Sequence, residues 1–142
     1  MHLFTIPTWV FVANAIAAAL LAAWKGGWPE RAVAAVLLVE WVTENDVILR
    51  LSLPFWYQSA WDVVILATCV TCALRTNRYW TLAASSFALL EVVTYALLLV
   101  PGPGKWAWES MQRVWTVLIY VALLLGVRSA GRSRKPPAAV SV

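Results

Sequence analysis

Residues 79–127 read YWTLAASSFALLEVVTYALLLVPGPGKWAWESMQRVWTVLIYVALLLGV, and this stretch decides the fold class. Two apolar runs, 79–100 and 106–127, lie on either side of the sequence PGPGK, which is a strong helix breaker. Each run has about 20 residues, the length that an α-helix needs to cross the hydrocarbon core of a bilayer. The stretch therefore predicts two antiparallel transmembrane helices that are joined by a short turn.

The rest of the chain contains three more apolar segments, 6–24, 29–49 and 56–74. Turn-forming or polar residues separate them, with KGGW at 25–28 and RTNR at 75–78. We therefore predict an all-α fold, an integral membrane antiparallel bundle of five transmembrane helices. The alternative is four spans plus one short or re-entrant helix, because several carboxylates follow the apolar start of segment 29–49.

The predicted spans form a single transmembrane helical domain over residues 1–128. The first apolar segment has no Lys or Arg before it, so we expect a retained span rather than a cleaved signal peptide. Residues 129–142 combine basic side chains with Pro136 and Pro137. This composition predicts a basic, disordered cytoplasmic tail.

Composition excludes several classes of protein. The 142 residues are 62% hydrophobic and 13% charged, whereas a soluble domain is about 45–50% apolar and about 25% charged. A chain this short and apolar, with a mean hydropathy of +0.74, has too little polar surface to coat a soluble core. We therefore exclude a water-soluble enzyme, a disordered region and a nucleic-acid-binding domain, and we expect the lipid bilayer as a partner.

Basic residues set the expected topology. Five spans place eight of the eleven Lys and Arg residues on one side of the membrane. Because basic residues accumulate on the cytoplasmic side, we expect a multi-pass protein of a bacterial inner membrane with its N-terminus outside and its C-terminus cytoplasmic. The eight residues are Lys25, Arg31, Arg75, Arg78, Arg128, Arg132, Arg134 and Lys135, and the other three are Arg50, Lys105 and Arg113.

The chain is also rich in tryptophan, with ten Trp residues, and most of them lie near predicted span ends. Amphipathic aromatic rings favour the headgroup level of a membrane, so we expect an aromatic belt. The residues assigned to this belt are Trp9, Trp24, Trp28, Trp56, Trp61, Trp80, Trp106 and Trp108.

The acidic residues show the opposite asymmetry, because only Glu30 of the seven falls on the basic side. A charge at bilayer depth costs about 2.5–3.5 kcal/mol, so such side chains turn inward and pair. Glu109 lies four residues before Arg113, the favourable order for a helical ion pair. We therefore predict an interior polar cluster centred on Arg113, as a ligand or ion candidate. Its residues are Glu40, Asp62, Glu91, Glu109 and Arg113.

Two functions agree with this cluster. In the first, the cluster fixes helix register, and the protein is a non-enzymatic structural or accessory component that associates with itself or another membrane protein. In the second, the carboxylates bind or conduct a proton, a cation or a small ligand. In both cases we expect Arg113 to contact at least one acid, and its removal to cost about 3–5 kcal/mol of folding free energy.

Other reactive residues do not form a catalytic arrangement. Cys69 and Cys72 have CxxC spacing, but they lie near the C-terminal end of a predicted helix, where the helix dipole disfavours a thiolate. His2 is the only histidine, so a haem with two axial His ligands or a serine hydrolase has no suitable base or ligand set. We expect no enzyme activity, no cofactor and no metal.

The stretch from Asp62 to Leu74, followed by RTNRYW at 75–80, resembles a family of small bacterial inner-membrane proteins. In that family an aspartate-bearing apolar helix ends in a basic turn that is followed by two aromatic residues. The resemblance covers about residues 29–128 and implies the architecture alone, since the family has no assigned activity. PTWVF at 7–11 also resembles an early motif of the tryptophan-rich sensory (translocator) proteins, which would imply small-ligand binding.

Overall fold

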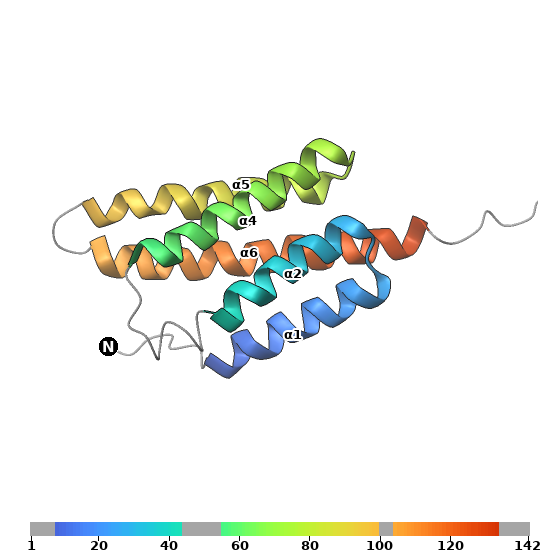
Figure 1. The fold of residues 1–142 in the computed structure, drawn as a ribbon, viewed down its shortest axis with the longest axis horizontal. Coiled ribbons are helices and arrows are strands. Elements are labelled where there is room, and N and C mark those ends of the chain that lie inside the picture. Colours follow the sequence, from blue (N-terminus) through green and yellow to red (C-terminus); the bar gives the residue numbers. More distant parts are fainter. Residues whose placement is uncertain (1–7, 44–54, 100–103, 134–142) are drawn as a thin grey trace, which may run out of the picture.

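The computed structural model describes residues 8–43, 55–99 and 104–133, and these form helices joined by short turns. Figure 1 shows the helices side by side, with the helix axes close to one common direction. In chain order they are α1 (Thr8–Lys25), α2 (Trp28–Thr43), α4 (Phe55–Arg75), α5 (Tyr79–Thr94), which continues as the 3-10 helix η2 (Tyr95–Leu99), and α6 (Gly104–Ser133). Within the described residues the predicted all-α bundle is confirmed.

Local sequence explains where these helices begin and end. Gly26 and Gly27 separate α1 from α2, and Pro29 lies in the first turn of α2, where its missing N–H is not needed. Residues 76–78 separate α4 from α5. The predicted end of the second span at residue 49 lies outside the described residues, since α2 is described to Thr43.

The predicted boundary of the tail is wrong. Helix α6 continues to Ser133, whereas a disordered tail was expected from residue 129. The helix continues because this turn still packs on the bundle, with Val127 and Ala130 buried. Residues 134–142 lie outside the described part of the chain.

The core of the bundle is built largely from small side chains. Small residues let helix backbones approach closely, which is how helices pack when the hydrophobic effect does not drive them together. Larger apolar side chains, among them Leu37, Ile65 and Ile119, fill the centre. The buried alanines are Ala15, Ala18, Ala22, Ala34, Ala84, Ala88, Ala122 and Ala130.

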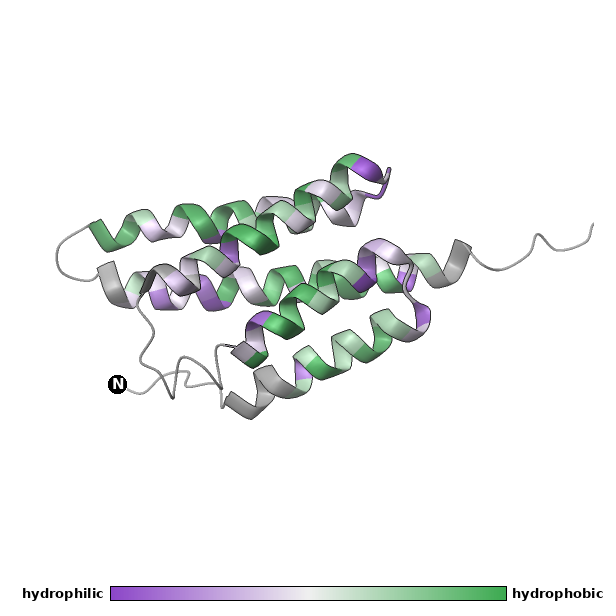
Figure 2. Cartoon of the chain, viewed as in Figure 1, coloured by the Kyte–Doolittle hydropathy of each residue, from purple (hydrophilic) through white to green (hydrophobic). Residues whose placement is uncertain are grey.

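Large apolar side chains lie on the outside of the bundle. Leu20, Leu74, Leu82 and Leu125, on four different helices, are each more than half exposed. In Figure 2 hydrophobic ribbon dominates the helices, and hydrophilic residues occur at the turns and at isolated positions. Two described helical stretches are long and apolar enough to cross a membrane, Tyr79–Leu99 and Trp106–Ala130.

Candidate functional site

Asp62 lies at the centre of a group of side chains that we call the acidic interior cluster: Glu40, Asp62, Glu91, Tyr95, Gln112 and Thr116. The Asp62 side chain, on α4, is only 4% exposed. Its Oδ2 accepts hydrogen bonds from the Tyr95 hydroxyl of η2 and from Gln112 Nε2 of α6, the latter at 3.4 Å. Glu40 of α2 also forms a side-chain hydrogen bond with Asp62. Four segments of the bundle therefore meet at this one carboxyl group.

Glu91 is the second buried acid of the acidic interior cluster. It lies on α5 and is 5% exposed, and the Thr116 hydroxyl on α6 donates to its Oε1 at 2.7 Å. One turn further along the same helix pair, Trp115 Nε1 donates to Thr94 Oγ1 at 2.9 Å. These bonds form a polar seam between α5 and α6, the two neighbouring helices that contain the longest apolar stretches.

Gln112 links the two acids. Its side chain is buried, its amide nitrogen faces Asp62, and its backbone carbonyl oxygen lies 2.9 Å from the Thr116 hydroxyl. Its side-chain oxygen Oε1 is buried with no hydrogen-bond partner among the described residues. An unsatisfied buried acceptor of this kind costs about 1–3 kcal/mol.

Of the five predicted site residues, the structure brings Glu40 and Asp62 together, buries Glu91 separately between α5 and α6, and leaves Glu109 and Arg113 exposed. The prediction that Arg113 lies at the centre of the cluster is wrong. Residues facing the bundle on α6 include Gln112 and Ile119, and each residue turns the helix by about 100°, so Arg113 is directed away from them. Neutral donors from Tyr95, Gln112 and Thr116 take the place that was assigned to its charge.

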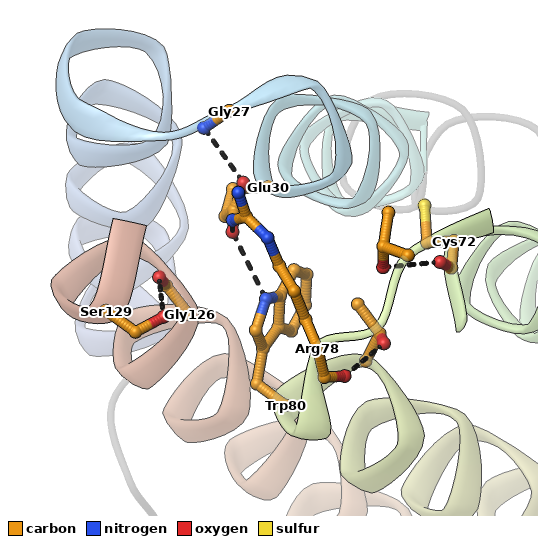
Figure 3. Close-up of polar contacts among 9 residues, drawn as sticks. Gly27, Glu30, Cys72, Arg78, Trp80, Gly126 and Ser129 are labelled. Carbon is orange, nitrogen blue, oxygen red and sulfur yellow. Dashed lines mark hydrogen bonds and ion pairs between the residues drawn. The ribbon is translucent and has the colours of Figure 1, made fainter. Parts of the chain in front are cut away.

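A second polar group lies at the end of the bundle where the two turns meet. We call it the turn cluster: Gly27, Glu30, Arg78, Trp80 and Gly126. Glu30 is fully buried, and its Oε1 accepts from the Arg78 guanidinium and, at 3.1 Å, from Trp80 Nε1 (Figure 3). Its Oε2 accepts from the backbone N–H of Gly27 at 2.8 Å. Every acceptor atom of this buried carboxylate is thus satisfied.

Two glycines make the close packing of the turn cluster possible. A Cβ atom at Gly126 would lie 2.6 Å from two carbon atoms of the Trp80 ring, so the indole rests directly on the backbone of α6. A Cβ atom at Gly26 would lie 2.5 Å from the carbonyl oxygen of Ala22 and 2.8 Å from Glu30 Cβ. The turn cluster therefore joins α1, α2, α5 and α6 at one end of the bundle.

Sequence reasoning missed the turn cluster. Glu30 was noted only as the acid on the basic side, and Trp80 was assigned to the aromatic belt, yet Trp80 is buried and bonded to Glu30. A usable signal was present, because a Glu three residues after the residue that caps a helix can bond back to the N–H of that cap. Glu30 stands in this relation to Gly27.

The two cysteines lie in the apolar core. Cys69 and Cys72 are both buried, and neither forms a disulfide. Among the described residues no group of three or more His, Cys, Asp and Glu side chains is arranged to hold a metal ion.

Comparison of the chain with family models, with curated proteins and with solved structures gives no match. The resemblance to a family of small bacterial inner-membrane proteins therefore stays a prediction.

Proposed function

We propose that the chain is a small multi-pass membrane protein of a bacterial inner membrane, with five helices that all cross the bilayer. The observation that supports this proposal best is the apolar outer surface. Large hydrophobic side chains are exposed on every described helix, among them Leu20, Val39, Leu74, Leu89 and Leu125. A contiguous apolar surface of this extent would aggregate in water, and lipid covers it without cost.

The interior has the complementary composition. Glu30, Asp62 and Glu91 are buried in the bundle, while valines and leucines face outward. Ionisable residues in membrane helices face the bundle interior, because exposure to hydrocarbon costs several kcal/mol. Treatment of membranes with alkaline carbonate tests the location. We expect the protein to stay in the membrane pellet, and release into the supernatant would contradict the proposal.

Charge supports the proposed orientation. Exposed basic residues lie at the end of the bundle with the turn cluster, and Glu109 lies toward the other end. A reporter fused after Val142 should therefore signal from the cytoplasm, and one inserted at Pro103 should signal from outside. Opposite signals at both positions would reverse the topology, and equal signals would contradict a membrane span formed by α6.

Within this membrane assignment, we propose a non-enzymatic structural or accessory role, in association with a second copy or another membrane protein. The acidic interior cluster supports it, because its hydrogen bonds cross between helices and fix their register. The hydrogen bond from Thr116 to Glu91 joins α6 to α5, and the hydrogen bond from Tyr95 to Asp62 joins η2 to α4. Buried polar groups of this kind specify one arrangement of helices among several apolar ones.

A second function, binding or conduction of a proton or a cation, is favoured by one specific observation. Asp62 and Glu40 place two carboxyl groups within interaction distance of each other in the bundle. Gln112 Oε1 beside them is an acceptor with no partner among the described residues. The site thus combines two acids with an amide oxygen, the kind of oxygen ligands that a proton or small cation would need.

Flux across reconstituted vesicles separates the two functions. Wild type would be compared with Asp62→Asn and Glu91→Gln under an imposed proton or sodium gradient, and Glu109→Gln serves as the exposed control. Flux that is lost in Asp62→Asn and retained in Glu109→Gln would establish conduction. Absence of flux in wild type would contradict conduction and leave the accessory role.

A further inference from the structure

The end of the bundle at the turn cluster carries a dense positive surface. Gly27 lies next to Arg78, and Gly126 lies against Trp80, so both turns and the C-terminal part of α6 meet there. Glu30 is the acid at this end among the described residues, and it is fully buried and directed inward. The basic side chains at this end, of which only Arg78 is partly buried, are Lys25, Arg31, Arg75, Arg78 and Arg128.

Arg78 is the best-positioned member of this surface. One N–H of its guanidinium bonds Glu30, and Glu30 is itself held by Gly27 and Trp80. The Arg78 side chain is 37% exposed, and its other guanidinium donors have no acceptor among the described residues. A guanidinium has five N–H donors in a planar fork that matches the oxygens of a phosphate. Glu30 therefore holds the Arg78 guanidinium in one orientation (Figure 3).

Aromatic residues place this surface at the depth of lipid headgroups. Trp24 is 75% exposed, Trp28 is 52% exposed and Tyr79 is 90% exposed, and all three lie beside the two turns. Lys25 Nζ lies 5.0 Å from the centre of the Trp24 ring. Exposed Trp and Tyr beside basic residues are typical of the level of a bilayer where the phosphates lie.

We propose that Arg78, oriented by Glu30, binds the phosphate of an anionic phospholipid headgroup, with Arg31, Arg75 and Arg128 adding positive charge around it. This inference rests on the proposed membrane location. Each basic residue at a charged membrane surface contributes about fivefold in affinity, so removal of one exposed arginine should be measurable.

The test uses the full chain in detergent micelles and in phosphatidylcholine vesicles. Phosphatidylglycerol is titrated in, and bound lipid is counted by native mass spectrometry while tryptophan fluorescence reports the unfolding midpoint. We expect phosphatidylglycerol to bind and raise the midpoint, and an equal amount of phosphatidylcholine to do neither. Inorganic phosphate at the same concentration distinguishes a lipid from a free phosphate ligand, and an equal effect of inorganic phosphate would overturn the lipid assignment.

Helix α6 supplies a matched pair of variants. Arg128 and Arg113 are both exposed arginines of α6, but Arg113 lies toward the opposite end of the bundle. Arg128→Gln should weaken phosphatidylglycerol binding about fivefold, and Arg113→Gln should leave it unchanged. Equal losses in the two variants would show a diffuse charge effect and overturn the site.

Arg78→Lys tests the fork itself, because it keeps the charge beside Glu30 and removes the planar arrangement of donors. We expect a larger loss of phosphatidylglycerol affinity than in Arg128→Gln, with folding checked by the unfolding midpoint in phosphatidylcholine. Unchanged affinity in a folded Arg78→Lys protein would contradict the role of Arg78. Stable insertion into neutral vesicles without preference for phosphatidylglycerol would overturn this inference alone and leave the membrane proposal intact.

Discussion

Each of the two polar clusters stabilises a buried carboxyl group, but the hydrogen-bond partners differ. In the turn cluster, the buried Glu30 carboxylate is held by a cation, an indole N–H and a backbone N–H. In the acidic interior cluster, Asp62 is held by a phenol, an amide and another carboxyl group, and no cation in the described part of the chain contacts it. The first arrangement pairs the buried carboxylate with a cation, whereas the second surrounds it with a phenol and an amide in place of an ion pair.

The comparison predicts unequal responses to loss of the acid, and the largest response belongs to Glu30→Ala. This change leaves the Arg78 charge, the Trp80 N–H and the Gly27 N–H without their acceptor. We expect a loss of about 3 kcal/mol in the free energy of unfolding, at the lower end of the range for a buried ion pair because Arg78 is partly exposed. Denaturation in mixed detergent micelles measures it.

Glu109→Ala provides the control, since Glu109 is exposed and should contribute within about 0.5 kcal/mol. A Glu30→Ala protein as stable as this control would show that the turn cluster does not hold the bundle together.

Gly126→Ala should have the next largest effect. The new methyl group would overlap the Trp80 ring, which should cost about 1–3 kcal/mol by overpacking. Trp80→Phe removes part of that ring, so the double variant should lose less stability than the sum of the two single variants. Strict additivity in this double-mutant cycle would contradict direct contact between Trp80 and the α6 backbone.

Asp62→Asn should have a small effect on stability. The amide keeps the size of the side chain and an oxygen that accepts from Tyr95, and no cation is left unpaired. We expect a change in unfolding free energy of less than about 1 kcal/mol in either direction. A loss as large as that of Glu30→Ala would remove the distinction between the two clusters, and the same denaturation experiment decides it.

Arg113→Ala should have the smallest effect, within about 0.5 kcal/mol, because its side chain is exposed. The sequence alone predicted a loss of about 3–5 kcal/mol for this change. A measured loss in that range would mean that Arg113 pairs with an interior acid after all, and the acidic interior cluster would then resemble the turn cluster.

Sequence patterns predicted the helices well, because apolar segment length and Gly or Pro breakers are local properties. They also identified Asp62 and Glu91 as interior acids, because a charged side chain exposed to hydrocarbon is costly and therefore faces the interior of a helix bundle. The partner of each acid was harder to predict. Arg113 was favoured by its spacing from Glu109, but a rotation of one residue along α6 directs Gln112 inward instead.

Glu30 illustrates the opposite error, because its burial depends on Arg78 and Trp80, which lie on another part of the chain. No local periodicity reveals that two turns meet in space. The charge pattern at this end was interpreted only as a signal of topology, which stays a prediction, and it concealed the acid that the basic turn residues surround.

The Glu30–Arg78 pair also has a consequence for biosynthesis. Its members are 48 residues apart, so at about 5–20 residues per second Glu30 leaves the ribosome roughly 2–10 s before its partner. During that interval the α1–α2 hairpin carries an acid without its counter-charge. The hairpin therefore gains the contribution of this pair only when the α4–α5 turn arrives, while α6, which packs on the same end of the bundle, is still to be made.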